Sequence, residues 1–347
     1  DWGGISLEVY YDRKHDDNVE MMLDAIQASL EYYTKNFGPY THQQARIIEF
    51  PRYATFAQAF PGTMPYSEAF GFIIDLEDTT KNNVINAVIA HEMAHQWWAH
   101  QEIGASMQGG TMLTESFSEY SSLMVMKQKK DDFQMKEFLK YDFNRYLRGR
   151  ATEREKELPL YQVENQSYIH YGKGSVILYG LQAYIGEEKV NRALRNFLEE
   201  YRYQPPPYPT SLDFIKHLEK EVPDSLDYLI EDWFKKITLY DFRLEEATYE
   251  KLAEDLYQVE LKLINRKMYA DTLGNETETK LADWVDIGLF SDAEAENPIL
   301  IQRVMLKSGS QNLRFEVDQL PAKAAIDPKR LLIERVYDDN YKSIKEG

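Results

Sequence analysis

The segment VIAHEMAHQWWAHQ (residues 88–101) contains the side chains whose types and spacing are best suited to catalysis. His91 and His95 are one helical turn apart in an apolar run that predicts a helix, so both imidazoles project from the same face. Two imidazoles at this spacing can bind one tetrahedral metal ion. Glu92 lies beside that face, where a general base is needed. Zinc lowers the pKa of its bound water from ~15.7 to about 7, and the adjacent carboxylate can then take the proton.

Two histidines make an incomplete site, because catalytic zinc usually has three protein ligands and one open position. The candidate third ligand is Glu115 in GGTMLTESFSEY, on the next predicted helix, and glycines between the two helices allow the chain to reverse. Glu119 lies one turn beyond Glu115, where it could accept a hydrogen bond from the far nitrogen of a ligand histidine. Alternatively, both histidines are ordinary core or surface residues, but two of only seven histidines fall on this motif.

Composition narrows the classes of partner and of metal ligand. The chain has no cysteine, so disulfides and thiolate-bound metals are excluded, and any metal must be held by His, Asp or Glu. With 58 acidic against 40 basic residues the formal charge is −18, and such a surface repels phosphate backbones and anionic lipid. We therefore expect no nucleic-acid partner. No run approaches the ~18 consecutive apolar residues of a membrane-spanning helix.

Hydrophobic periodicity predicts an α+β fold for the 347 residues. Residues 83–236 are mainly helical in pattern, and short strand-like segments separated by turn signals begin near residue 241. The sequence therefore predicts a first domain at 1–240 and a small antiparallel β-sandwich domain at 241–347. The elements expected before the helical region are strands at 5–11, 45–50 and 70–75, a helix at 18–36 and a loop at 51–66.

The motifs AHEMAHQWW and LTESFSEY together resemble the signature of the aminopeptidase N family of gluzincin zinc metallopeptidases. In that family zinc is bound by residues that match His91, His95 and Glu115, and the general base matches Glu92. The segment IHYGKGSV resembles a further family motif, whose tyrosine stabilises the oxyanion of the reaction and matches Tyr171. A preorganised donor at that oxygen is worth roughly 3 kcal/mol. The resemblance implies one Zn²⁺ per chain and a peptide substrate.

The chain departs from the family pattern in three places. The spacer between His95 and Glu115 has 19 residues, one more than is usual, and we expect the glycine-containing loop before Met112 to absorb it. The motif that binds the free amine of the substrate is not intact. Its nearest match is PGTMPYSEAFG, which implies that Glu68 binds this amine. The large N-terminal β-domain and the C-terminal helical domain of the family are not part of this sequence.

For residues 1–240 the resemblance implies a thermolysin-like catalytic domain, with a small α/β sheet lobe and a helical lobe. Runs such as ELPLYQVENQSYIHY also resemble the soluble C-terminal peptidase region of bacterial permease-like membrane proteins. Because the chain begins at Asp1 rather than at methionine, we expect it to be part of a longer protein. The resemblance implies covalent continuity with a membrane-embedded region and a place at the bacterial cell envelope. A cytoplasmic or periplasmic location is the alternative.

The leading functional hypothesis is a zinc-dependent aminopeptidase. An endopeptidase of the same fold is the first alternative, because no intact motif marks the end that binds a free amine. The second alternative is a zinc-containing regulatory or binding module of a membrane transporter. Glu92 weighs against this last hypothesis, because a structural zinc needs no base and usually has four protein ligands.

Overall fold

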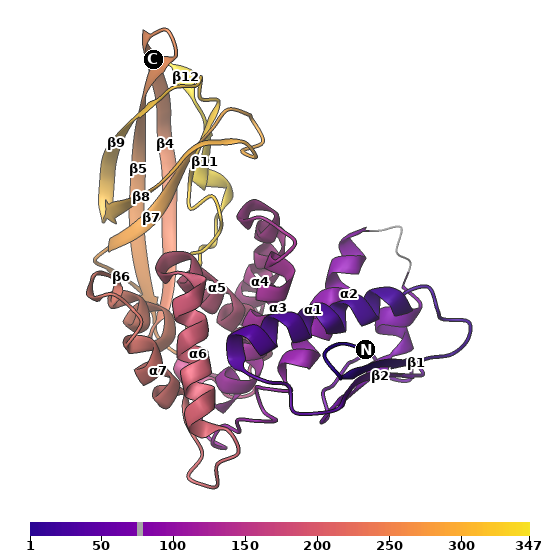
Figure 1. The fold of residues 1–347 in the computed structure, drawn as a ribbon. Coiled ribbons are helices and arrows are strands. Elements are labelled where there is room, and N and C mark those ends of the chain that lie inside the picture. Colours follow the sequence, from indigo (N-terminus) through magenta and orange to yellow (C-terminus); the bar gives the residue numbers. More distant parts are fainter. Residues whose placement is uncertain (75–78) are drawn as a thin grey trace. The chain divides into compact units, whose positions relative to one another are not determined.

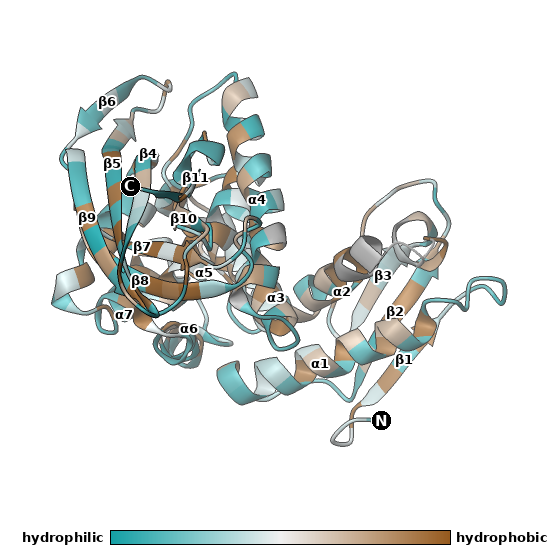
Figure 2. Cartoon of the chain, turned by 90° about the horizontal axis from the view of Figure 1, so that it is seen from above, coloured by the Kyte–Doolittle hydropathy of each residue, from teal (hydrophilic) through white to brown (hydrophobic). Residues whose placement is uncertain are grey.

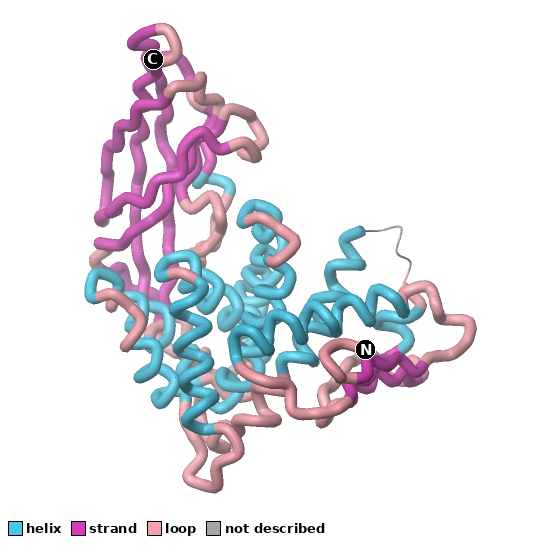
Figure 3. Tube along the Cα trace, in the orientation of Figure 1, coloured by secondary structure: helices cyan, strands magenta, loops and turns pink. Residues whose placement is uncertain are grey.

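The computed structural model describes residues 1–74 and 79–347, and the fold is α+β, as the sequence predicts. The described chain divides into two compact units (Figure 1). The first comprises Asp1–Asp131 and Leu160–Glu231, and the second comprises Asp132–Pro159 and Asp232–Gly347. Most strands belong to the second unit, whereas helices dominate the first (Figure 3). The domain division predicted at residue 240 stays a prediction.

The first unit contains a three-stranded sheet and most of the helices. None of the helices in the described residues is both long enough and apolar enough to cross a membrane. The elements are β1 (Ser6–Tyr10), α1 (Val19–Phe37), β2 (Gln44–Phe50), β3 (Thr63–Ser67), α2 (Thr79–Ala94), α3 (Phe117–Lys127), α5 (Gly174–Ile185), α6 (Glu187–Tyr201) and α7 (Ser211–Glu219), with π-helical turns η1 (Glu68–Phe72), η2 (Met112–Ser116) and η4 (Tyr168–Lys173).

The sheet of the first unit is parallel, in the order β1-β2-β3. A parallel pair needs a crossover connection, and α1 supplies it between β1 and β2. Along β2, Ala45 and Ile47 are fully buried while Ile48 is exposed, so the two faces of the sheet differ in burial. Figure 2 shows α1 lying along this sheet, with polar and apolar segments alternating along the helix. The sheet is therefore half covered, and its buried face contributes to the core.

The strand expected at 70–75 was wrong, and so was part of the loop expected at 51–66. The third strand is β3, and the chain then turns into η1, which occupies the first half of the expected strand. Residue 75 lies outside the described residues. After β3, Gly71 and Phe72 are buried by close packing within η1, and Ile73 is exposed. A Cβ at Gly71 would lie 2.5 Å from the Tyr66 ring. Asn18 also donates hydrogen bonds to the carbonyls of Gly71 and Phe72.

An aromatic cluster anchors the end of α2. Trp97 and Trp98 are fully buried. The ring of Trp97 lies 5.3 Å from that of Tyr33, and the ring of Trp98 lies 5.0 Å from Phe37 and 5.3 Å from Phe117. These edge-to-face contacts add about 0.5–1.5 kcal/mol per pair beyond the burial of area. The cluster joins α1, the end of α2 and α3 into one core.

The residue after this tryptophan pair has an unusual backbone conformation. Ala99 has a φ of 97°, in the region where a Cβ is crowded and glycine is not. We expect Ala99→Gly to raise the free energy of unfolding by roughly 0.5–1 kcal/mol, net of the entropy that glycine adds to the unfolded chain. The matched control is Ala87→Gly within α2, which should cost roughly 1 kcal/mol. Urea unfolding of both variants checks this; a less stable Ala99→Gly would contradict it.

The second unit contains two sheets and one long helix. The five-stranded sheet has the order β12-β4-β5-β6 with β9 also paired to β5, and the four-stranded sheet has the order β11-β10-β7-β8. All of these pairs are antiparallel except β12 with β4. The elements are α4 (Asp132–Thr152), β4 (Ile237–Ala253), β5 (Leu256–Ala270), β6 (Glu276–Thr279), β7 (Ala282–Phe290), β8 (Pro298–Lys307), β9 (Gly309–Val317), β10 (Lys323–Ile326), β11 (Tyr341–Ser343) and β12 (Lys345–Glu346).

Alternate residues of both sheets form the core of the second unit. Val259 and Leu263 of β5 and Val285 and Ile287 of β7 are fully buried, which is the period expected for strands with one covered face. A buried ion pair also lies here: the Lys267 Nζ is 2.9 Å from Asp283 and 2.7 Å from Asp232. Removing one member of such a group leaves an uncompensated charge, at a cost of about 3–5 kcal/mol.

Candidate metal centre

The two motif histidines lie at the end of α2, within the first unit. His91 belongs to the last turn of α2, and His95 directly follows the helix, with its backbone N–H donating to the His91 carbonyl at 3.3 Å. Each is only 8% exposed. The two rings are nearly perpendicular, at 86°, with their centroids 4.8 Å apart. Helix geometry therefore places both imidazoles on one side, as their spacing in the sequence predicts.

Close contacts on the outer side of each ring indicate which nitrogen of each histidine faces inward. The Nδ1 atom of His91 lies 2.6 Å from the Glu119 carboxylate. The Nδ1 atom of His95 lies 3.0 Å from the Trp98 carbonyl and 3.0 Å from the Ser118 hydroxyl. A carboxylate or carbonyl oxygen can only accept, so each Nδ1 is the protonated nitrogen and each Nε2 keeps a lone pair. Both lone pairs are then available to a metal ion.

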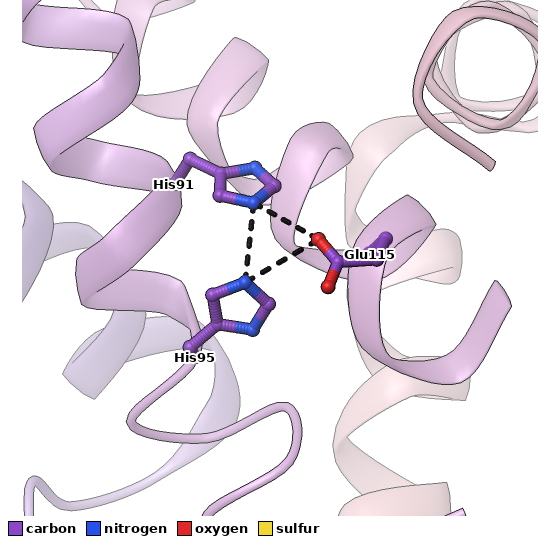
Figure 4. A group of neighbouring side chains, drawn as sticks. All are labelled: His91, His95 and Glu115. Carbon is purple, nitrogen blue, oxygen red and sulfur yellow. Dashed lines mark hydrogen bonds and ion pairs between the residues drawn. The ribbon is translucent and has the colours of Figure 1, made fainter. Parts of the chain in front are cut away.

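The three inward-facing atoms form a small triangle (Figure 4). The Glu115 Oε2 lies 3.2 Å from the Nε2 of His91 and 3.5 Å from the Nε2 of His95, and the two Nε2 atoms are 3.1 Å apart. Zinc bonds of 2.0–2.1 Å in a tetrahedron place ligand atoms about 3.3 Å apart. The triangle therefore has the dimensions of three zinc ligands. Two nitrogen lone pairs at 3.1 Å repel each other, and a cation between them removes that repulsion.

Electrostatics of the site favour a bound cation. Burial alone would raise the pKa of Glu115, but its contacts with the His91 and His95 imidazoles overcome this effect and hold the pKa far below its usual range. Burial alone would lower the pKa of His91, yet the carboxylates of Glu115 and Glu119 raise it well above its usual value. The carboxylates around His91 therefore favour a positive charge at this site, which a divalent ion would supply.

Glu92 and Tyr171 are close to this centre. The Glu92 side chain is 7% exposed; burial raises its pKa, while the neighbouring His91 and His95 lower it. The ring of Tyr171, in η4, lies 5.6 Å from the ring of His91. Burial raises the pKa of Tyr171, and its hydrogen bond with Glu115 raises it further, so the phenol keeps its proton at neutral pH. Both groups predicted from the sequence are thus beside the three candidate ligands.

Glu68 belongs to a different group of side chains. One of its carboxylate oxygens accepts a hydrogen bond from the Arg52 backbone N–H at 3.1 Å and lies 3.7 Å from the Arg52 guanidinium. Polar atoms of Glu68, His15 and Glu49 lie within 4.8 Å of one another, and the His15 Nδ1 is 2.5 Å from Glu49. This group shares no residue with the triangle at His91, His95 and Glu115.

The long spacer between His95 and Glu115 is accommodated in an irregular segment before η2, where Glu115 lies. Gly109 has a φ of 87°, and a Cβ there would lie 2.3 Å from the Tyr161 carbonyl and 2.3 Å from the Ser211 hydroxyl. Only glycine fits this close approach. The glycine-containing loop thus brings η2 to the end of α2, and the extra residue does not displace the carboxylate.

Two residues near the centre were missed by sequence reasoning. Ser118 contacts the Nδ1 of His95, and its position three residues after Glu115 on the same helical stretch was a signal that could have found it. Gln96 bonds to the backbone of the chain before β3. No local pattern points to Gln96, because its partners are more than 30 residues away in the sequence.

Comparisons with known proteins show the family to which the chain belongs. Residues 21–233 match the peptidase family M1 domain. Among curated relatives, the probable aminopeptidase 1 of Sulfurisphaera tokodaii is 23% identical over 222 residues, covering 62% of this chain and 28% of the relative. The leucyl aminopeptidase of Saccharolobus solfataricus is 26% identical over 224 residues, covering 60% of this chain and 27% of the relative. The chain thus spans less than a third of the length of these relatives.

A solved structure, Legionella pneumophila aminopeptidase A in complex with aspartic acid, resembles the fold with a TM-score of 0.60 and 14% sequence identity. It covers 95% of this chain, which covers 36% of that protein. At this identity the likeness shows the fold alone. The family match spans more than half of the sequence and contains the His91–Glu115 region. The resemblance seen in the motifs is therefore confirmed, and this chain belongs to peptidase family M1.

Proposed function

We propose that the chain is the catalytic part of a zinc-dependent aminopeptidase. The observation that carries the proposal is the triangle of two Nε2 atoms and one carboxylate oxygen, with edges of 3.1–3.5 Å. His91, His95 and Glu115 would hold one zinc ion, and the names of the matched relatives point to N-terminal hydrolysis. A peptide is the expected partner, and no nucleic acid is expected.

In this proposal one residue of the chain transfers the proton and another stabilises the negative charge that develops during the reaction. Zinc, when bound, supplies Lewis acidity toward water and the scissile carbonyl. The Glu92 carboxylate takes a proton from the attacking water and returns it to the leaving nitrogen. The Tyr171 phenol donates a hydrogen bond to the carbonyl oxygen as negative charge develops there. Glu119 and Ser118 keep the two imidazoles oriented through their Nδ1 atoms.

The finer architecture is also part of the proposal. A thermolysin-like domain with a sheet lobe and a helical lobe is supported by the parallel sheet beside α1 and by the site at the α2–η2 junction. A β-sandwich after it is supported by the two antiparallel sheets of the second unit. Attachment to a membrane-embedded region of the bacterial envelope is supported only by the sequence resemblance.

Recognition of the substrate's free amine by Glu68 is the least supported part of the proposal. Its carboxylate already contacts Arg52, and it lies in the group with His15 and Glu49. A carboxylate that already has cationic neighbours gains less from a substrate ammonium group than an unpaired one does. The endopeptidase alternative therefore remains the second candidate, favoured by this engagement of Glu68.

The choice between these functions is tested with one peptide in two forms, with a free or an acetylated N-terminus. We expect zinc-dependent cleavage of the free form at least about tenfold faster in kcat/KM, because an unpaired substrate ammonium group would be bound by a carboxylate. Cleavage is followed by separation of the products, with zinc removed by a chelator as control. Equal rates for the two forms would replace the aminopeptidase by an endopeptidase. Zinc binding without any hydrolysis would favour a regulatory or binding module.

A further inference from the structure

A tight turn precedes β3 and joins it to residues 56–60. Phe60 and Thr63 exchange two backbone hydrogen bonds of 2.8 and 3.0 Å, which closes a turn with Pro61 and Gly62 at its centre. Gly62 has a φ of 64°, as expected for the second central residue of such a turn. A Cβ at Gly62 would lie 3.0 Å from the Gln44 Nε2 and 3.1 Å from the Gln44 carbonyl. The turn is therefore closely fitted to β2.

Residues 56–60, before this turn, run antiparallel to β3 and form the outer edge of the sheet. The Gln58 N–H donates to the Pro65 carbonyl at 3.2 Å, and the Ser67 N–H donates to the Phe56 carbonyl at 3.1 Å. In an antiparallel pair the peptide groups alternate in direction, so those of Ala57 and Ala59 face away from β3. Within residues 1–74 and 79–347, no strand pairs with that outer edge. An unpaired edge can bind an extended peptide.

Gln96 connects this edge to the metal centre. Its side chain is 1% exposed, its Oε1 accepts a hydrogen bond from the Gly62 N–H at 2.8 Å, and its Nε2 donates to the Phe60 carbonyl at 3.1 Å. The side-chain amide thus binds the turn as a backbone peptide group would. Gln96 directly follows the candidate ligand His95. One buried side chain therefore determines where the edge lies relative to the metal-binding imidazole.

The base is also connected to this part of the sheet. Tyr66 of β3 is fully buried, and its pKa is raised by burial and by the charge of Glu92. The helix-facing side of β3 therefore reaches the neighbourhood of Glu92. Ala57 lies opposite Tyr66 in the antiparallel pair, so an extended peptide paired along residues 56–60 would lie one strand further out from β3.

We propose that Gln96 is a positioning residue for the substrate: it holds residues 56–60 beside the metal centre so that an extended peptide can pair with Ala57 and Ala59. This inference rests on the proposed function, because the peptide that pairs with the edge is the substrate. Backbone pairing along the edge is the same before and during the reaction. Losing the position of the edge therefore weakens binding in both states, which raises KM and leaves kcat nearly unchanged.

The test uses the full chain loaded with zinc, and compares Gln96→Met with Gln101→Met. Both substitutions replace a buried glutamine near the end of α2 by an unbranched apolar side chain. Gln101 is 2% exposed and donates to the Gln96 and Pro39 carbonyls, without a contact to the turn. We expect Gln96→Met to raise KM about tenfold, since both side-chain hydrogen bonds that hold the turn are lost. Gln101→Met should leave KM within about twofold, and zinc content should stay at one per chain in both.

A second measurement separates this inference from the proposed function. A fluorescent tetrapeptide is titrated into the Glu92→Gln protein and into the Glu92→Gln, Gln96→Met double variant, with anisotropy as the signal. We expect about a tenfold higher Kd for the double variant. If the wild type hydrolyses nothing but this difference is found, the proposed function falls and the positioning role stands. Equal Kd values, no binding by either protein, or equal KM values for Gln96→Met and Gln101→Met would overturn the inference.

Discussion

The Glu92→Gln variant is expected to keep its fold and its zinc but to lose at least about 10²-fold in kcat with a peptide substrate. Glutamine has nearly the same shape as glutamate and cannot take the proton from water. Glu92 is buried, and burial raises its pKa, so a neutral amide costs little in folding at this position. Steady-state kinetics, metal analysis and thermal unfolding of the same preparations check the three parts of this expectation.

The matched control for Glu92→Gln is Glu102→Gln. Glu102 is 1% exposed, and burial raises its pKa to about 8, so at pH 7 it is already mainly uncharged. Its replacement by glutamine should leave kcat within about twofold, because no proton transfer is assigned to it. A Glu92→Gln protein that cleaves peptides at the wild-type rate would rule out Glu92 as the base. Equal losses in both variants would indicate a general effect of burying an amide near α2.

The Glu115→Ala variant is expected to lose stoichiometric zinc after dialysis, because only two of the three inward-facing atoms of the triangle remain. Glu119→Ala should weaken zinc binding by a smaller factor, about 10–100-fold, because Glu119 only orients the Nδ1 side of His91. Zinc per chain is measured by elemental analysis, and the dissociation constants by competition with a chelator. The loss of zinc affinity is expected to be larger for Glu115→Ala because Glu115 would bind zinc directly, whereas Glu119 only orients a ligand.

A stability measurement supplies an independent check of the Glu115 prediction. A ligand that binds only the folded state stabilises it, by about 2.7 kcal/mol at a concentration of 100 times its Kd. Zinc should therefore raise the unfolding temperature of the metal-free wild type and should raise that of Glu115→Ala much less. A Glu115→Ala protein that retains one zinc per chain and shows the full shift would require another third ligand.

The local parts of the candidate site could be predicted from the sequence, because they depend on helix geometry alone. His91 and His95 share a face since i and i+4 residues of a helix always do, and Glu92 lies beside that face for the same reason. Glu115 could be named because few carboxylates follow in a region that can fold back on the helix. The structure places the relevant atoms of His91, His95 and Glu115 within 3.5 Å of one another.

Secondary structure was predictable where one periodicity dominated. The helix expected at 18–36 corresponds to α1, and the strand expected at 45–50 corresponds to β2. The third strand was misplaced because apolar residues can be buried either in an extended strand or in a tightly packed helical turn, and the two look alike in a sequence. Gly71 and Phe72 are buried in η1, where Tyr66 and Met22 pack around Gly71, whereas β3 is extended despite containing a proline. Pro65 is compatible with this strand because its carbonyl still accepts from Gln58.

The sequence by itself determined the family, the α+β class and the candidate ligands and base, because each of these is recorded in short motifs or in a helical period. Only the tertiary structure decided which nitrogen of each histidine faces inward, since Glu119, Trp98 and Ser118 meet the two rings through folding. It also decided that Glu68 lies with His15 and Glu49, and that Gln96 bonds the turn before β3. Contacts between residues far apart in the chain have no period, so spacing cannot reveal them.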